Sequence, residues 1–171
     1  MLSSLPADAS AKEREAQYAS LTERLVALLD GERDAVALYA TVACELHHSF
    51  DAFHWTGVYR VTSPGLLTVG PYQGGHGCLR IPFDRGVCGA AARTGETQRV
   101  DDVRLLPHHI ACSATTRSEL VVPVRNTSGD IVAVLDIDSD YENYFLEEDQ
   151  VCLEALCAML AEKFLHVSLK G

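Results

Sequence analysis

The chain has 171 residues, of which 47% are hydrophobic and 22% are charged, an ordinary composition for one soluble globular domain. Its 14 basic and 24 acidic residues give a net charge of -10, which would repel nucleic-acid phosphates and anionic membrane surfaces. No secretory signal is visible, and no apolar run approaches the ~18 residues of a membrane span. We therefore expect a cytoplasmic protein that binds neither nucleic acid nor membrane.

The first third of the chain predicts two helices. Over about residues 12–29, four apolar side chains recur at helical spacing and form one stripe: Tyr18, Leu21, Leu25 and Leu28. A second helix is expected over about residues 34–49, and residues 1–11 are expected to form a flexible tail.

The middle of the chain predicts a sheet. Two strand-like runs, FHWTGVYRV and LLTVGPYQG, are joined by TSPG, in which Pro64 and Gly65 supply a turn. A second hairpin, LVVPV and IVAVLDID, turns around residues 126–130. Between the hairpins, GVCGAAARTGE predicts a short helix that ends at Gly95.

A final helix is expected over about residues 146–167. Acidic residues begin it, and four apolar side chains are expected to be buried: Leu153, Leu156, Leu160 and Phe164. Helices at both ends with antiparallel hairpins between them indicate an α+β fold, a central mainly antiparallel sheet with the N- and C-terminal helices packed on a face. No linker or repeat divides the chain, so residues 1–171 are expected to form one domain.

Six cysteines in a cytoplasmic chain should be reduced at rest, which favours redox chemistry, metal binding or burial over structural disulfides. Three of them lie in apolar helical patterns and are expected in the core: Cys44, Cys152 and Cys157. The other three lie in the glycine-rich and polar middle of the chain: Cys78, Cys88 and Cys112. No Cys-x-x-Cys or His-x-x-x-His spacing occurs, and adjacent histidines point apart on a regular element, so we expect no metal site.

Two carboxylates interrupt the last predicted strand, in VLDIDS. Asp136 and Asp138 alternate with apolar residues, so they share a face at a spacing of about 6.5 to 7 Å. Their repulsion would raise at least one pKa, which a cationic ligand would relieve, although a solvent-facing polar edge would show the same alternation. Because Glu119 begins the partner strand, we expect Cys112 beside three carboxylates. Nearby negative charge raises the pKa of a thiol and makes it a poor nucleophile toward a neutral ester. The three acids suit a substrate that has an ammonium group and an oxygen that needs a proton.

Six stretches together resemble the free methionine-R-sulfoxide reductases, which are single GAF domains. They cover most of residues 15–165: FHWTGVYRV, GPYQG, CLRIPFDRGVCGAAARTGETQRVDDV, PHHIACSATTRSELVVPV, VAVLDIDS and FLEEDQ. The three middle cysteines combined with the three acids are more specific than any single motif. The resemblance implies a GAF-like fold and an enzyme without a bound cofactor that reduces free L-methionine-R-sulfoxide to L-methionine, a reaction relevant to oxidative stress.

The resemblance also implies roles for the cysteines. Cys112 aligns with the catalytic cysteine, which attacks the sulfoxide sulfur and becomes a sulfenic acid, while Cys78 and Cys88 align with the two other redox cysteines. A sulfenic acid condenses with a second thiol, and a dithiol reductant of thioredoxin type, supplied indirectly by NADPH, reopens the disulfide. We expect Cys78 to be this second thiol, because a glycine-rich loop can close over a site whereas a packed helix cannot.

The substrate-binding residues follow from the same resemblance. Glu119, Asp136 and Asp138 align with acidic residues that bind the amino group and help to protonate the sulfoxide oxygen, and Trp55 and Tyr59 align with aromatic residues beside the substrate methyl group. The alternative function is a non-catalytic GAF sensor for a small molecule, because a shared fold does not fix function. An acidic pocket would repel a phosphate-bearing ligand of such a sensor. The sequence does not fix the oligomeric state, and a homodimer is possible.

Overall fold

The computed structural model of the chain describes residues 3–106 and 114–163. Within these residues, four α-helices and six β-strands follow in the order α1, α2, β1, β2, β3, α3, β4, β5, β6, α4, with one turn of 3₁₀ helix, Val103–Leu105, before β5. No helix in these two ranges is both long enough and apolar enough to cross a bilayer.

The first two helices, α1 (Ala11–Leu28) and α2 (Ala35–His47), lie within two residues of their predicted ranges. Each starts at a side chain that accepts a hydrogen bond from the first turn, Ser10 for α1 and Asp34 for α2. The predicted stripe on α1 is wrong at its end. Leu28 is 50% exposed, and Leu29, one turn beyond the buried Leu25, lies in the core instead.

The residues before α1 lie against the body of the domain where they are described. Leu5 pairs with Phe50 in a parallel bridge, and its backbone N–H donates to the carbonyl of Ser49 at 2.9 Å. The flexibility expected of residues 1–11 stays a prediction.

All strands belong to one sheet. Their bounds are β1 (Phe53–Ser63), β2 (Leu66–Gly74), β3 (Arg80–Pro82), β4 (Gln98–Val100), β5 (Ser118–Arg125) and β6 (Ile131–Ser139). The order across the sheet is β3-β2-β1-β6-β5-β4, and every neighbouring pair is antiparallel. Both predicted hairpins are confirmed. The three-residue strands β3 and β4 were not predicted, because they are too short to show an alternating pattern.

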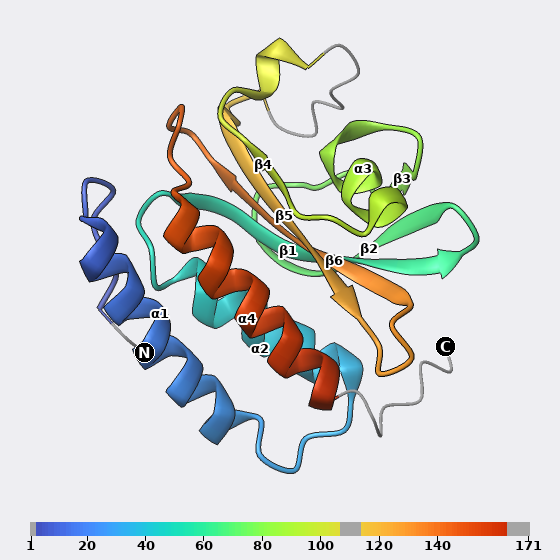
Figure 1. Cartoon of the computed structure of the whole chain (residues 1–171), viewed down its shortest axis with the longest axis horizontal. Coiled ribbons are helices and arrows are strands. Elements are labelled where there is room, and N and C mark those ends of the chain that lie inside the picture. Colours follow the sequence, from blue (N-terminus) through green and yellow to red (C-terminus); the bar gives the residue numbers. More distant parts are fainter. Residues whose placement is uncertain (1–2, 107–113, 164–171) are drawn as a thin grey trace.

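The two faces of the sheet carry different layers. Helices α1, α2 and α4 (Glu147–Lys163) lie on one face, and α3 (Gly86–Thr94) lies on the other (Figure 1). A large hydrophobic core fills the space under α1, α2 and α4, and a smaller one fills the space under α3. The α+β architecture expected from the sequence is therefore confirmed.

Three of the six cysteines lie on helices that cover the large core, Cys44 on α2 and Cys152 and Cys157 on α4. On α4, Leu153, Leu156 and Leu160 are buried as predicted, and the prediction for Phe164 lies outside the described residues. Cys157 is also in this core, and Cys152 packs against it while partly exposed. Cys44 is only half-buried on α2, with its sulfur 3.8 Å from His48 Nδ1, so the core position expected for it is wrong.

Candidate active site

The three acids meet because their strands are adjacent in the middle of the sheet. In the register of β1, β6 and β5, Asp138 lies between Trp55 and Glu119. Two residues before Asp138 on β6, Asp136 pairs with Gly57 of β1. Alternation along each strand turns these side chains to the face that α3 covers, whereas their sequence neighbours Leu135 and Ile137 enter the large core.

Helix α3 adds a thiol to the acids. Cys88 points from α3 toward the sheet, and its Sγ lies 3.9 Å from Glu119 Oε1. The side chains of Cys88, Glu119 and Asp136 are 3–6% exposed, and one potential ligand atom from each lies within 4.8 Å of the others. The solvent-facing alternative is therefore excluded for Asp136. Asp138, one rung away, is partly exposed.

Burial controls the protonation of this cluster. It raises the pKa of Asp136 to about 7, although hydrogen bonding with Cys88 and Glu119 opposes the rise. It also raises the pKa of Glu119 well above the ordinary value, helped by the charges of Asp136 and Asp138. The pKa of Asp138 is raised by burial among protein atoms and then by Asp136 and Asp140. The cluster therefore holds protons at a pH where exposed carboxyl groups have lost theirs.

No cation offsets these charges among the described residues. None of the ion pairs in that part of the chain includes Glu119, Asp136 or Asp138. Asp136 Oδ1 is buried without a hydrogen-bond partner in the described structure. The Cys88 thiol cannot offset these charges, because a thiol carries no positive charge. Burial, followed by the charges of Asp136 and Glu119, raises its pKa and keeps it neutral. The arrangement suits a ligand that brings a positive charge.

An aromatic wall stands next to the acids. The Trp55 indole stacks on Tyr59, with ring centroids 5.6 Å apart, and on Tyr72, with centroids 5.4 Å apart. Tyr72 was not predicted as a site residue. The signal for it was its place in the quoted stretch GPYQG, but its contact with Trp55 follows from its pairing opposite Gly57, which only the register of β1 and β2 shows.

The β2–β3 loop, which carries Cys78, lies against this wall. Trp55 Nε1 donates to the carbonyl of Gly75 at 3.2 Å. A Cβ on Gly77 would lie 2.9 Å from both the Trp55 ring and the Tyr59 hydroxyl, so the loop backbone packs directly on the rings. The indole therefore fixes the position of the segment that leads into Cys78.

The cysteines to which the resemblance assigns redox roles differ in state. Cys78 is half-buried and disulfide-bonded, whereas Cys88 is a buried free thiol, like Cys157 in the large core. Cys112 lies outside the described residues, so its position beside the carboxylates stays a prediction. The first buried residue where the description resumes, at residue 114, is Thr116. Its hydroxyl lies 3.3 Å from His54 Nε2, and His54 in turn lies 3.2 Å from Asp140.

The chain is similar to several known proteins. A family model described as the GAF domain matches residues 13–163. The chain is 44% identical to the protein YtsP of Bacillus subtilis, over 81% of this chain and 85% of that protein. It is 39% identical to the free methionine-R-sulfoxide reductase of Escherichia coli, over 86% of this chain and 88% of that protein.

A solved structure extends the likeness to three dimensions. The free methionine-R-sulfoxide reductase from Neisseria meningitidis, solved in complex with its substrate, shares 36% identity and superposes with a TM-score of 0.85, covering 96% of each chain. The chain therefore belongs to the GAF domain family and, within it, to the free methionine-R-sulfoxide reductases.

Proposed function

We propose that this protein reduces free L-methionine-R-sulfoxide to L-methionine. The observation that carries the proposal is the cluster of Glu119, Asp136 and Asp138 beside the aromatic wall, in a chain that belongs to this reductase family. The substrate offers an ammonium group to the acids, a polar oxygen to a protonated carboxyl group, and a methyl group to the rings of Trp55 and Tyr59.

The acids make the free amino acid the preferred substrate. The ammonium group supplies the positive charge that the described residues around Asp136 do not provide, and the unpartnered Oδ1 is available to accept its hydrogen bond. A methionine sulfoxide within a peptide has no ammonium group at this place. It would leave the buried carboxyl groups unpaired, which selects against it strongly.

The chemical step transfers one oxygen atom. The Cys112 sulfur attacks the sulfoxide sulfur, the sulfur–oxygen bond of the substrate breaks, and the oxygen ends on Cys112 as a sulfenic acid while methionine leaves. The sulfoxide gains the two electrons that the thiol loses. Asp136, whose pKa is raised to about 7 by burial, acts as the general acid that protonates the departing oxygen.

A second thiol then regenerates the enzyme. The Cys78 thiol condenses with the sulfenic acid, a disulfide forms, and water leaves with the oxygen atom. A dithiol of thioredoxin type reduces this disulfide by exchange and becomes oxidised itself. The state of the cysteines supports this order, because Cys78 is disulfide-bonded while Cys88 is a free thiol buried under α3.

A coupled assay tests the proposed activity. We expect oxidation of NADPH through thioredoxin reductase and thioredoxin when free methionine-R-sulfoxide is supplied, and little oxidation with the S epimer or with N-acetylmethionine-R-sulfoxide, which lacks the ammonium group. Cys112→Ser should form no methionine even in a single turnover. Full turnover by this variant, or equal rates with the N-acetyl compound, would contradict the proposal, and binding of the sulfoxide without turnover would favour a sensor.

Single-turnover variants test the second thiol. Cys78→Ser should release about one methionine per site and then stop, because the oxygen transfer survives and the regeneration does not. Cys88→Ser should keep turning over at a lower rate. If mass spectrometry after one equivalent of sulfoxide found Cys112 linked mainly to Cys88, the proposed order of the thiols would be wrong.

A further inference from the structure

We propose that Cys88, Glu119 and Asp136 form a binding site for a zinc ion, and that this ion competes with the substrate. The metal site consists only of residues that the structure describes. Its role as an inhibitor rests on the proposed function, because it requires that the same carboxyl groups hold the substrate ammonium group.

The geometry of the three side chains is close to that of a metal site. The Cys88 Sγ and Glu119 Oε1 are 3.9 Å apart, and Asp136 completes a triangle whose atoms lie within 4.8 Å of one another. Ligands of a tetrahedral zinc ion, at bond lengths of about 2.0 to 2.3 Å, are roughly 3.3 to 3.8 Å apart. Rotamer adjustments of a few tenths of an ångström, up to about one, bring the three donors onto a single ion.

A second observation points to a ligand at this place. Asp136 is only 5% exposed, and its Oδ1 has no hydrogen-bond partner among the described residues. Such an atom loses its hydration on folding and gains nothing in return unless something binds to it. The neighbouring Cys88 and Glu119 are acidic groups too, so a cation satisfies all three at once.

The chemistry of the donors selects the metal. A thiolate is a soft ligand that Mg²⁺ and Ca²⁺ avoid, whereas Zn²⁺ accepts sulfur and carboxylate oxygen together. Three protein ligands leave the fourth position of a tetrahedral ion for water. No spacing motif in the sequence predicts this site. Its donors come from α3, β5 and β6, and they meet only because the helix packs on the sheet.

The consequence for the enzyme is a competition between two cations. An ammonium group and a zinc ion both need Glu119 and Asp136, so zinc excludes the substrate while it is bound. The metal displaces protons from the thiol and the carboxyl groups, and its affinity therefore rises with pH. Free zinc thus makes the reductase inactive until a chelator or a high concentration of sulfoxide removes it.

Cobalt(II) in place of zinc tests the site by its spectrum. We expect the full chain, with all its thiols reduced, to bind one equivalent of Co²⁺ and show the d–d bands of a tetrahedral ion together with a sulfur-to-cobalt charge-transfer band, and Zn²⁺ should remove both. In Cys88→Ala the charge-transfer band should vanish. Asp136→Asn and Glu119→Gln should each weaken binding at least tenfold, and they keep the test decisive if Cys88→Ala does not fold.

Two control variants exclude the other thiols. Cys157→Ala removes a thiol that is as buried as Cys88, each 3% exposed, but lies in the large core, and it should keep the full cobalt spectrum. Cys78→Ser should also keep it. A charge-transfer band that persists in Cys88→Ala, one that is lost in Cys78→Ser, or no cobalt spectrum at millimolar metal would each overturn the proposed site.

The role as inhibitor is measured without thioredoxin, whose thiols would bind the metal. Methionine release in a single turnover of reduced enzyme should slow at least tenfold with one equivalent of Zn²⁺ and recover with excess sulfoxide. Slowing that excess sulfoxide does not reverse would overturn the competition. A protein that binds cobalt through Cys88 but forms no methionine without metal would refute the proposed function and leave the metal site standing, and the reverse result would refute the metal site alone.

Discussion

Two aspartates buried on opposite faces of the sheet differ in what surrounds them. Asp149, at the start of α4, is completely buried and fully partnered, whereas Asp136, under α3, is almost as deeply buried and has an oxygen without a partner in the described structure. Burial of a carboxyl group is unfavourable in both places, and only the first place offsets it within the protein.

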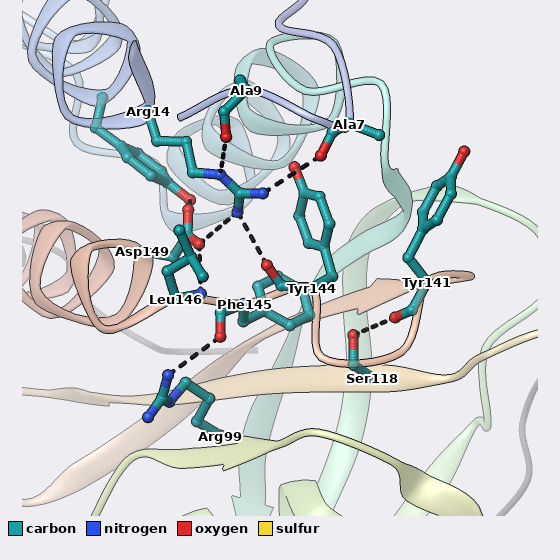
Figure 2. A network of polar contacts seen from close by, with 11 residues as sticks. Ala7, Ala9, Arg14, Arg99, Ser118, Tyr141, Tyr144, Phe145, Leu146 and Asp149 are labelled. Atoms are coloured by element: carbon teal, nitrogen blue, oxygen red, sulfur yellow. Dashed lines mark hydrogen bonds and ion pairs between the residues drawn. The ribbon is translucent and has the colours of Figure 1, made fainter. Parts of the chain in front are cut away.

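Figure 2 shows Asp149 within a network of polar contacts. Arg14 Nη1 donates to Asp149 Oδ2 at 2.6 Å, the Tyr18 hydroxyl donates to Oδ1 at 3.0 Å, and the backbone N–H of Leu146 donates to Oδ2 at 2.8 Å. The guanidinium of Arg14 lies 4.1 Å from the centre of the Tyr144 ring and also donates to the carbonyl of that residue. The network ties α1 to the start of α4, so its role is structural.

The difference shows how to distinguish a structural carboxyl group from a functional one. A structural group is satisfied by its own chain, as Asp149 is by a cation and two further donors. A functional group retains unsatisfied capacity that a ligand can use, as Asp136 does. Burial raises the pKa of Asp136 to about 7, and no cation in the described structure lowers it again.

The largest effect is expected on activity when the functional aspartate is changed. Asp136→Asn should lower kcat/KM for methionine-R-sulfoxide by about 10²–10⁴-fold, the usual contribution of a positioned general acid, because an amide cannot donate the proton and does not attract the ammonium group. Thermal unfolding should show no loss of stability. A variant with normal kcat/KM would remove Asp136 from the mechanism.

The largest effect on stability is expected from the structural aspartate. Asp149→Asn leaves Arg14 as a buried charge without its counter-ion, so the free energy of unfolding should fall by about 3–5 kcal/mol, measured by urea denaturation. The kcat/KM per folded molecule should stay within about threefold. The double variant Arg14→Met/Asp149→Leu should recover part of the stability, and no recovery would mean that the hydrogen bonds of the network outweigh its charges.

A smaller effect is expected in the pH dependence of stability. The pKa of Asp136 is raised from 3.8 to about 7, so between about pH 4 and pH 7 the folded state binds more protons than the unfolded state. Stability should therefore fall as pH rises through this window. Asp136→Asn should flatten this slope in urea denaturation series, and an unchanged slope would show that other groups set it.

The smallest effect is expected from the hydrogen bond that holds the β2–β3 loop. Trp55→Phe keeps an aromatic ring but removes the donor to Gly75, a bond of about 1 kcal/mol. Formation of the disulfide with Cys78 should slow by about fivefold in rapid-quench experiments, while methionine release in a single turnover changes less. Tyr72→Phe, which keeps the stacked ring, is the matched control and should change neither rate by more than about twofold.

Much of this protein could be predicted from its sequence because the signals are local. Helical spacing located α1, α2 and α4, the turn residues Pro64 and Gly65 located the first hairpin, and alternation placed Asp136 and Asp138 on one face of β6. The resemblance to the reductase family named the cysteines, the acids and two of the aromatic residues. These inferences need only neighbours in the sequence or a comparison of motifs.

The tertiary structure decided what depends on distant segments. The register of β1, β6 and β5 placed Trp55, Asp138 and Glu119 on one rung, and the packing of α3 put Cys88 against the acids, where no spacing motif predicted a donor. It also decided that Asp149 would find Arg14, 135 residues away, while Asp136 would find no cation in the described structure. A sequence shows which residues can carry charge, but the cost of burying that charge depends on partners that only the folded chain brings within reach.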